Sequence, residues 1–477
     1  MLDLLIINGT CPDFGAGKMV KRNVGIQGGK IVWLSEPLDD GTPLDDGAPV
    51  EQIDEAKESA PLPEAAEIID AAGKVVSPGF IDIHMHEENF AREGKDYVIS
   101  EMMLDMGVTT AVGGNCGVQY QTLAEFKDIL KEHGGSPVNY IMLAGYNWYR
   151  TQQGLGHYDK ASQAQMEQIQ KEMKKELAEG AWGISFGIEY DPGITYEEML
   201  FAVKASEDPN HLVAAHYRED CLGNIDSIEE MVKFSAEIPQ KFQISHLSSC
   251  SAMGMMKESL ECINAAMEKN PKLNYDTYPY NAFSTEIGSA VFEDGCLEGW
   301  GKDYDSILLT DEPYKNVYCT EEIFRKARSE FPKMLAVAFV MNEEEIGQAI
   351  ANPNGMVGSD AIINHGGGHP RAAGTFPRVL GKYVREEKLL PLVDALRKMT
   401  LEPAKRLGLD VKGRLAEGTD ADITIFDPET IIDKADWSHL EAPEGIEYVL
   451  IGGQKAIEKG KKVNDRLGRF ISYFADK

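Results

Sequence analysis

The stretch GFIDIHMHEE, residues 79–88, carries the clearest indication of the fold. Its apolar first half is typical of a buried β-strand, and two histidines, His84 and His86, follow it one residue apart. Residues i and i+2 of a strand face the same side, so both imidazoles are expected to project together from the end of the strand. Because an isolated H-x-H pattern is more often a pair of packed or exposed histidines, the rest of the chain has to decide.

Seven further apolar runs follow, separated by amphipathic stretches that predict helices, among them residues 121–133, 166–180 and 253–269. The runs are VTTAVGG (108–114), VNYIMLAG (138–145), AWGISFG (181–187), LVAAH (212–216), FQISH (242–246), LNYDTYPY (273–280) and MVGSD (356–360). Eight strand–helix units predict an α/β fold, a (β/α)8 TIM-like barrel. A doubly wound open sheet is the alternative, but its glycine-rich phosphate turn is missing.

Both ends of the chain read as half-buried strands, with Gly28 and Gly29 as a hairpin turn. We expect residues 1–75 and 413–477 to form one small β-sandwich domain beside a barrel of residues 76–412. Residues 36–66 are rich in proline, glycine and acids, which predicts a solvated and mobile loop. The long gap before the last barrel strand predicts an insertion at about 285–350.

The composition excludes several classes of partner. The 477-residue chain is 43% hydrophobic and 26% charged, with a net charge of −31, which disfavours nucleic acid and anionic membrane surfaces. The N-terminus lacks the basic region and cleavage site of a signal peptide, and no apolar run is long enough to span a membrane. Seven cysteines without paired spacing indicate a cytoplasmic protein. The sequence leaves open whether copies associate into a homo-oligomer.

Other predicted strands also end in metal-binding residue types. His216 closes LVAAH, His246 closes FQISH and Asp360 closes MVGSD. Imidazoles and a carboxylate at one rim suit a catalytic divalent metal, most often zinc. Asp360 is also suited to general acid–base work. Cys116, in GGNCGV, is either a free buried cysteine or a thiolate that completes a zinc site with His216 and His246.

These motifs together give a family resemblance. The chain resembles the metal-dependent amidohydrolase superfamily and, within it, the D-aminoacylase (N-acyl-D-amino-acid deacylase) family, along nearly its whole length. The resemblance rests on PGFIDIHMH (78–86), GGNCG (113–117), EGAWGISFGIEYDPG (179–193), AHYRE (215–219), QISHL (243–247), GSD (358–360) and HPRAAGTFPRVLGKYVRE (369–386). Of these, GNCG combined with HPR-x-x-GTFPRVLG is the most specific.

The resemblance implies a ligand set. A tightly held zinc would bind Cys116, His216 and His246. A second, weaker position would use His84, His86, Asp360 and the shared Cys116. The carboxylated lysine that bridges two metals elsewhere in the superfamily is excluded, because no lysine occurs between 176 and 203. Glu189 is either a substitute ligand or a polar residue at the barrel rim.

The same resemblance implies hydrolysis of the linear amide of a small molecule, an N-acyl-D-amino acid. A metal-activated water would attack the amide, with Asp360 as base and then acid. Arg371 would contact the substrate carboxylate, Tyr280 and Ser284 would assist, and Tyr190 would lie near the acyl or side-chain pocket. For Arg371 alone a structural salt bridge is nearly as plausible, and Arg378 is expected to be structural.

Two departures from the family pattern concern the substrate. Ser248 stands where the family usually has a lysine that contacts the substrate carboxylate, and GYNWYR (145–150) replaces a G-H-x-x-x-R pattern. Either Arg150 or Arg218 supplies the missing charge, or the substrate lacks an α-carboxylate there. His365 and His369 flank three glycines and could be additional ligands or substrate contacts, although a mobile loop is the simpler interpretation.

Three alternatives to the deacylase remain. A cyclic-amide hydrolase of the hydantoinase or dihydroorotase kind, or an isoaspartyl-type dipeptidase, would normally carry the missing lysine. A non-catalytic barrel scaffold should have lost several of the ligands, whereas this chain keeps all six.

Overall fold

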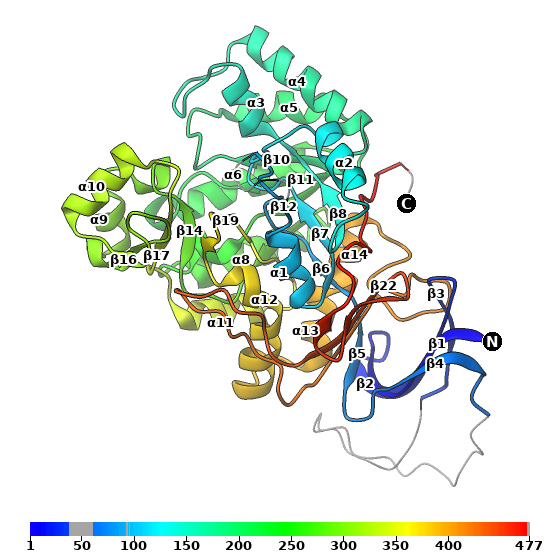
Figure 1. The fold of residues 1–477 in the computed structure, drawn as a ribbon. Coiled ribbons are helices and arrows are strands. Elements are labelled where there is room, and N and C mark those ends of the chain that lie inside the picture. Colours follow the sequence, from blue (N-terminus) through cyan, green and yellow to red (C-terminus); the bar gives the residue numbers. More distant parts are fainter. Residues whose placement is uncertain (38–60, 92–93, 95, 475–477) are drawn as a thin grey trace.

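The computed structural model describes residues 1–37, 61–91, 94 and 96–474 (Figure 1). Most of the predicted acidic loop, residues 36–66, therefore lies outside the described residues. Its last two positions already belong to strand β4 (Ala65–Asp70), so the prediction ran two residues too far. Within the described part of the chain, no helix combines the length and the apolar character that crossing a membrane requires.

Parallel strands make up the centre of the fold, and each of the eight predicted runs contributes to them. One sheet has the order β6 (Phe80–Asp82), β7 (Val108–Gly113), β8 (Asn139–Met142). The other has the order β18 (Met356–Val357), β13 (Leu273–Thr277), β12 (Lys241–Ile244), β11 (Leu212–His216), β10 (Gly183–Gly187), β9 (Ala144–Gly145). Their side chains are buried almost throughout, as parallel sheets covered on both faces require.

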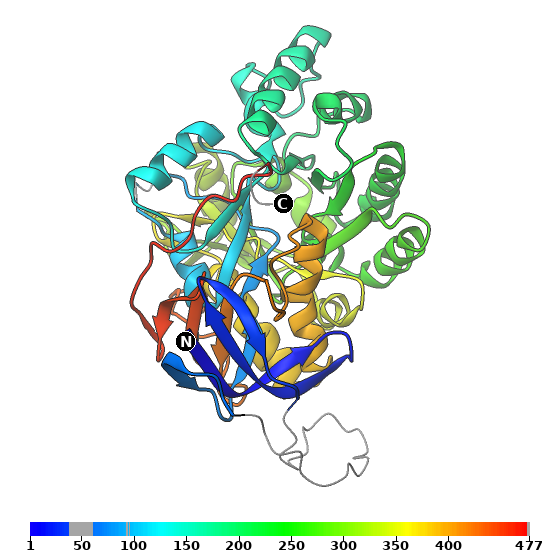
Figure 2. The same cartoon turned by 90° about the vertical axis from the view of Figure 1, so that its right-hand side faces the viewer.

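Helices follow these strands and surround them (Figures 1 and 2). They include α1 (Ile99–Asp105), α2 (Leu123–Glu132), α4 (Gln163–Ala178), α6 (Asn224–Glu237) and α8 (Met256–Met267). Helix α2 starts in a capping box, in which Thr122 and Glu125 each accept a hydrogen bond from the other's backbone N–H. The predicted helical stretches 121–133 and 253–269 enclose α2 and α8, and α4 begins three residues before the third stretch.

Strands from both chain ends pair in one nine-stranded sheet, seen at the lower right of Figure 1. The N-terminal part supplies β1 (Leu2–Asp13), β2 (Lys18–Gln27), β3 (Lys30–Leu34), β4 and β5 (Val75–Pro78). The C-terminal part supplies β21 (Ile423–Phe426), β22 (Ile446–Ile451), β23 (Gln454–Glu458) and β24 (Lys461–Lys462). The two parts join where β5 runs antiparallel to β21. Gly28 and Gly29, both with positive φ, make the predicted turn between β2 and β3.

A separate antiparallel sheet lies between β13 and β18 in the sequence. Its order is β14 (Phe283–Glu286), β17 (Leu335–Ala338), β15 (Ile307–Leu309), β16 (Val317–Tyr318). Helices α9 (Cys296–Trp300) and α10 (Glu321–Glu330) accompany it, and the segment forms the lobe at the left of Figure 1. Helices α12 (Arg371–Arg378), α13 (Leu392–Met399) and α14 (Leu401–Leu407) follow β18.

Candidate metal centre

The carboxyl ends of five parallel strands bring the predicted ligands together. His84 and His86 follow β6, Cys116 follows β7, His216 ends β11, His246 follows β12 and Asp360 follows β18. Two groups have ligand atoms that all lie within 4.8 Å of one another. The first contains His84, His86, Cys116 and Asp360, and the second contains Cys116, His216 and His246. Cys116 belongs to both groups, so its sulfur lies between them.

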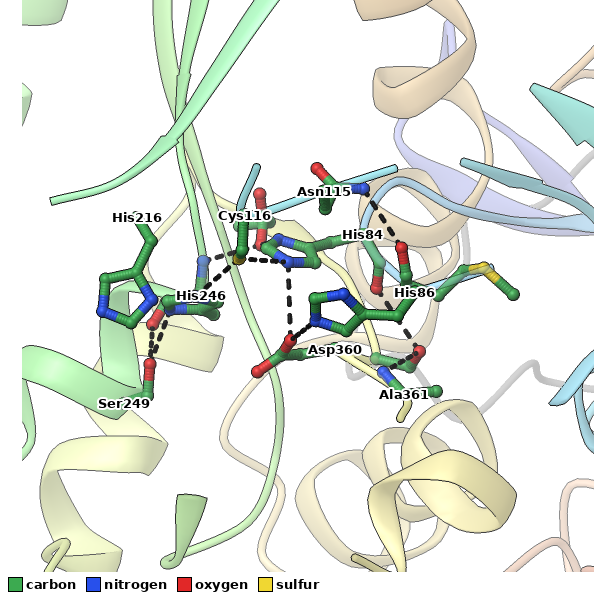
Figure 3. A network of polar contacts seen from close by, with 12 residues as sticks. His84, His86, Asn115, Cys116, His216, His246, Ser249, Asp360 and Ala361 are labelled. Carbon is green, nitrogen blue, oxygen red and sulfur yellow. Dashed lines mark hydrogen bonds and ion pairs between the residues drawn. The ribbon is translucent and has the colours of Figure 1, made fainter. Parts of the chain in front are cut away.

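The distances describe one continuous cluster (Figure 3). The Cys116 Sγ lies 3.3 Å from the Nε2 atoms of both His84 and His246. The Asp360 Oδ1 lies 3.1 Å from His86 Nε2 and 3.5 Å from His84 Nε2. Figure 3 shows His216 on the side of Cys116 that faces away from His86. All six side chains are buried.

Three of these residues have a backbone conformation that non-glycine residues rarely adopt. Cys116, His246 and Asp360 have φ values of 53°, 32° and 52°. Such left-handed conformations carry strain and cluster at functional sites. The sequence around Cys116 suits this conformation. Glycines 113, 114 and 117 have no side chain at points where the chain packs closely against its neighbours.

A buried carboxylate, which the sequence did not reveal, orients the imidazole of His84 and holds the backbone of His246. Asp276, in β13, accepts a hydrogen bond from His84 Nδ1 at 2.9 Å and from the backbone N–H of His246 at 2.8 Å. Gln243 Nε2 donates to its other oxygen at 3.0 Å. With its Nδ1 donating to Asp276, His84 turns the lone pair of Nε2 toward Cys116 and Asp360, as a metal ligand should.

His216 uses its two nitrogens differently. Its Nδ1 has no partner among the described residues, although it is buried. Its Nε2 lies 2.5 Å from Glu189 Oε2 and 3.5 Å from Cys250 Sγ. Glu189, Cys250 and His216 thus form a third group of mutually close ligand types. Cys250 was missed by the sequence analysis, and its position four residues after His246, in α7 (Leu247–Ser251), is the only signal that could have found it.

Electrostatics favour the anionic forms of two ligands. Burial raises the pKa of the Cys116 thiol, but the neighbouring His246 and His84 charges more than reverse this and hold the pKa well below its ordinary value. Burial likewise opposes ionisation of Asp360, yet Arg371 and His246 hold the pKa of this carboxyl well below its usual range. A thiolate and a carboxylate lie among imidazoles, and the Nδ1 atoms of His86 and His216 have no partner among the described residues. This donor set fits a divalent cation of the zinc type.

A pocket opens on this cluster and receives two of the predicted substrate residues. His216, His246 and Asp360 line it together with Tyr190 and Ser284. The Tyr190 ring lies 4.6 Å from the His216 ring. The buried Ser284 hydroxyl has no partner within the described part of the chain.

Arg371 lies beside Asp360, at the start of α12. Its Nη2 is 2.9 Å from Asp360 Oδ2 and donates to the Ser284 carbonyl at 3.1 Å. The guanidinium stacks on Tyr278 at 4.6 Å. Its Nε and Nη1 are buried and lack partners among the residues that the structure describes. Arg371 is therefore both a salt-bridge residue and a donor with unused N–H groups.

Other predicted substrate residues are engaged elsewhere. The Tyr280 hydroxyl donates to Asp433 at 3.0 Å, and Arg378, stacked on the Tyr280 ring, binds the same carboxylate. The Ser248 hydroxyl is fully buried and accepts from Thr277 at 2.8 Å. Neither residue lines the pocket. Their prediction as substrate contacts differs from the structure because local carboxylate and hydroxyl partners already satisfy them.

Neither proposed replacement for the missing lysine is free to act as one. Arg150 is fully buried, forms an ion pair with Glu198 and donates to the Asp159 carbonyl at 2.7 Å. Arg218 binds both oxygens of Glu230, at 3.0 and 2.9 Å. The structure therefore gives no support to the hypothesis that either arginine supplies the lost charge, since their guanidinium groups bind carboxylates and neither residue lines the pocket.

The glycine segment after Asp360 also differs from the prediction. Instead of a mobile loop, β19 (Ile363–Asn364) and β20 (Gly367–Gly368) pair as a two-stranded hairpin. His369 donates from Nε2 to the Ala282 carbonyl at 3.0 Å and accepts at Nδ1 from the Arg371 backbone at 3.0 Å. Both nitrogens of His369 are used, which leaves no ligand atom. His365 is largely exposed and lies 3.4 Å from Asp311.

Comparison with known proteins places this geometry in a family. D-aminoacylase of Alcaligenes xylosoxydans xylosoxydans is 29% identical over 85% of this chain and 88% of its own length. The crystal structure of a D-aminoacylase superposes with a TM-score of 0.82 at 28% identity, covering 99% of this chain and 100% of that one. N-acyl-D-glutamate deacylase from Bordetella bronchiseptica, complexed with zinc and a phosphonate mimic of the tetrahedral intermediate, gives 0.81 at 26% identity and covers 99% of both chains.

The resemblance read from the motifs is thus confirmed. The model of the amidohydrolase family matches residues 75–456, which contain every ligand described above. Given this match and the cluster at the strand ends, the chain belongs to the amidohydrolase family.

Proposed function

We propose that this enzyme hydrolyses the linear amide bond of N-acyl-D-amino acids and depends on zinc. The observation that carries the proposal is the cysteine shared between two groups of ligands, with Asp360 and Arg371 beside it. Relatives that match over most of the chain are named D-aminoacylase and N-acyl-D-glutamate deacylase. The similar structure of N-acyl-D-glutamate deacylase from Bordetella bronchiseptica contains zinc.

The proposal includes the architecture. Leu143 alone separates β8 from β9, and an isolated parallel bridge joins Met85 to Ala361. Both features are those expected if the two parallel sheets form a single (β/α)8 barrel of residues 76–412, with an insertion at about 285–350. The nine-stranded sheet would then be a β-sandwich of residues 1–75 and 413–477, since buried side chains from both ends share one core cluster.

Zinc would be held tightly by Cys116, His216 and His246, and more weakly by His84, His86, Asp360 and the shared Cys116. When bound, it supplies a Lewis acid and lowers the pKa of water. A reducing cytoplasm is the compartment that suits such an enzyme, because the thiolate of Cys116 has to stay reduced.

The residues of the chain divide the remaining work. Asp360 takes a proton from the attacking water and passes it to the leaving amine. The free Nε and Nη1 of Arg371 bind the substrate carboxylate, while its Nη2 keeps Asp360 in place. Tyr190 and Ser284 line the space for the rest of the substrate, which excludes water around the amide.

The direct test compares N-acetyl-D-leucine with N-acetyl-L-leucine, and with the amide of the D-acid, using purified protein with and without a chelator. We expect no hydrolysis of the L-acid, much slower hydrolysis of the D-amide than of the D-acid, near-stoichiometric zinc, and loss of activity on chelation. A protein that is free of zinc after gentle purification and inactive when loaded with zinc would favour the scaffold. Preference for a hydantoin over every linear amide would favour the cyclic-amide hydrolase.

Arg371 can be tested against a matched arginine in the same helix. Arg371→Lys should raise the KM for N-acetyl-D-leucine by about tenfold to a hundredfold, because an ammonium reproduces only part of the guanidinium hydrogen bonding. It should change kinetics with the uncharged amide little. Arg378→Lys is the control, since Arg378 also stacks on a tyrosine and binds a carboxylate, but away from the pocket. Equal effects of both variants would contradict the role of Arg371.

A further inference from the structure

The pocket wall beyond His216 carries two carboxylates. Glu189 follows β10 and Asp220 follows β11, and both line the pocket that contains the candidate ligands His216, His246 and Asp360. No lysine or arginine is among the described residues that line this pocket. The wall is therefore acidic on the side of His216, whereas Arg371 lies on the side of Asp360.

No lysine or arginine among the described residues pairs with either carboxylate, although Glu189 forms an ion pair with His216. Glu189 contacts His216 through one oxygen, and Asp220 Oδ2 accepts a hydrogen bond from Trp300 Nε1 at 2.7 Å. Arg218 lies two residues before Asp220, but Glu230 binds its guanidinium on two nitrogens. Two adjacent carboxylates in a partly buried pocket repel each other and lose hydration, so the structure maintains them at a cost.

The negative charge of Glu189 affects the ionisation of Asp220. Burial and the neighbouring Glu189 raise the pKa of its carboxyl to about 7. The buried Ser284 hydroxyl lines the same pocket and has no partner within the described ranges of the chain. This hydroxyl is a second polar group in the pocket, separate from the two carboxylates, that can hydrogen-bond a ligand.

We propose that Glu189 and Asp220 bind a positively charged group of the substrate, an ammonium or a guanidinium. The proposal rests on the proposed function, because it takes this pocket to be the substrate pocket. Arg371 does not line this pocket but lies against Asp360, which does, so a substrate with a carboxylate at Arg371 and a cation at the acidic wall would match the charges at the two ends of the site. Phe283 and Val291 on the same wall would contact the apolar stem of such a group.

The cation can reside in the side chain or in the acyl group of the substrate. Three probes that share the same carbon skeleton distinguish these two positions. N-acetyl-D-norleucine carries no cation, N-acetyl-D-lysine carries it on the side chain, and glycyl-D-norleucine carries it on the acyl group. With the zinc-loaded enzyme, we expect one charged probe to exceed the neutral probe in kcat/KM by about tenfold or more, as a charge-assisted hydrogen bond predicts. If kcat/KM for the neutral probe equals or exceeds kcat/KM for both charged probes, the proposal is overturned.

Asp220→Asn tests the wall itself, with Glu219→Gln as the matched control. Glu219 is the preceding acid, is exposed and does not line the pocket. Asp220→Asn should remove most of the preference, measured as the ratio of kcat/KM for the charged probe to kcat/KM for N-acetyl-D-norleucine, whereas Glu219→Gln should leave that ratio unchanged. A preference that survives Asp220→Asn overturns the assignment. The comparison of probes on the unmodified enzyme stands even if this variant does not fold.

A binding measurement separates failure of this inference from failure of the proposed function. If the zinc-loaded enzyme hydrolyses none of the three probes, the deacylase function fails. Calorimetric titration of the unmodified protein with the same probes then still reports on the charge. A Kd for the neutral probe at or below both others overturns the cation site, and a Kd at least about tenfold lower for one charged probe supports it.

Discussion

The two ends of the parallel strands bury polar side chains for different purposes. At the amino ends, Arg406 donates to the carbonyls of Phe242 and Lys272, and Lys398 donates to those of Asn352 and Gly355. At the carboxyl ends, several buried polar atoms have no partner in the described ranges: His86 Nδ1, His216 Nδ1, Ser284 Oγ and two nitrogens of Arg371. No donor of Arg406 or Lys398 is buried without a partner in those ranges.

The difference separates structural from functional burial. A buried polar group without a partner costs roughly 1–3 kcal/mol, so a fold keeps few such groups, and one that lines a pocket is a candidate contact for a ligand. Satisfied cations at the amino ends are therefore expected to affect stability, and unsatisfied donors and acceptors at the carboxyl ends are expected to affect chemistry. Arg406, Gln243, Asp276 and His84 connect the two ends by successive hydrogen bonds.

The largest effect is expected at Cys116. Cys116→Ser replaces the thiolate by a hydroxyl that stays neutral, so the shared anionic ligand is lost. Activity should fall by about 10³-fold, or about 4 kcal/mol of transition-state stabilisation, together with the zinc content. Kinetics with N-acetyl-D-leucine and elemental analysis measure both.

Cys250→Ser is the matched control for that variant. Cys250 Sγ is also close to a candidate ligand, His216, but on its Nε2 side, next to Glu189. Its loss should cost less than about tenfold in activity, in the lower range for groups that only orient a ligand. Equal loss of zinc in both variants would mean that the third group of ligand types also holds metal.

Arg406 tests the opposite end. Arg406→Met removes the guanidinium hydrogen bonds to the carbonyls of Phe242 and Lys272, although the Phe242 N–H still donates to Lys272, and should lower the free energy of unfolding by about 2 kcal/mol. Urea unfolding of the zinc-loaded protein measures this change. Zinc content of the folded variant should stay unchanged. Loss of zinc at full stability would contradict the division between the two ends.

Residue patterns predict the positions of side chains relative to strands better than their contacts. The period of two and the position after each strand place His84, His216 and His246 at one rim. The partners of Arg150 and Tyr280 depend on which carboxylate a distant segment of the chain supplies, here Glu198 and Asp433, and no spacing along the chain encodes that.

The same limit applies to the supports of the cluster. Asp276 was read only as part of the strand LNYDTYPY, because its role exists only once β13 lies beside β12. The glycines 366–368 suggested mobility, yet their lack of side chains allows the close hairpin of β19 and β20, in which the space for a Cβ at Gly367 and Gly368 is taken by backbone carbonyls.

Lys398 predicts a pH dependence of stability at the amino end. Burial lowers its pKa from 10.5 to about 8. Between these pH values the unfolded chain binds more protons than the folded chain, so this residue makes stability rise with pH from about 8 to 10.5. The quantity to measure is the unfolding free energy of the native chain minus that of Lys398→Met. This difference should be about 2 kcal/mol larger at pH 10 than at pH 7.5. Parallel pH profiles of the two proteins would refute the shift.

The smallest effect, at Ser284, separates the two kinds of burial most sharply. Because its hydroxyl has no partner to lose among the residues that the structure describes, Ser284→Ala should leave the free energy of unfolding within about 0.5 kcal/mol or raise it. If a substrate uses the hydroxyl, KM should nevertheless rise by about threefold to tenfold. Ser245→Ala is the control, because its hydroxyl is equally buried and unpartnered among the described residues but does not line the pocket. Identical kinetics of the two variants would mean that an unsatisfied hydroxyl at this end does not by itself identify a binding group.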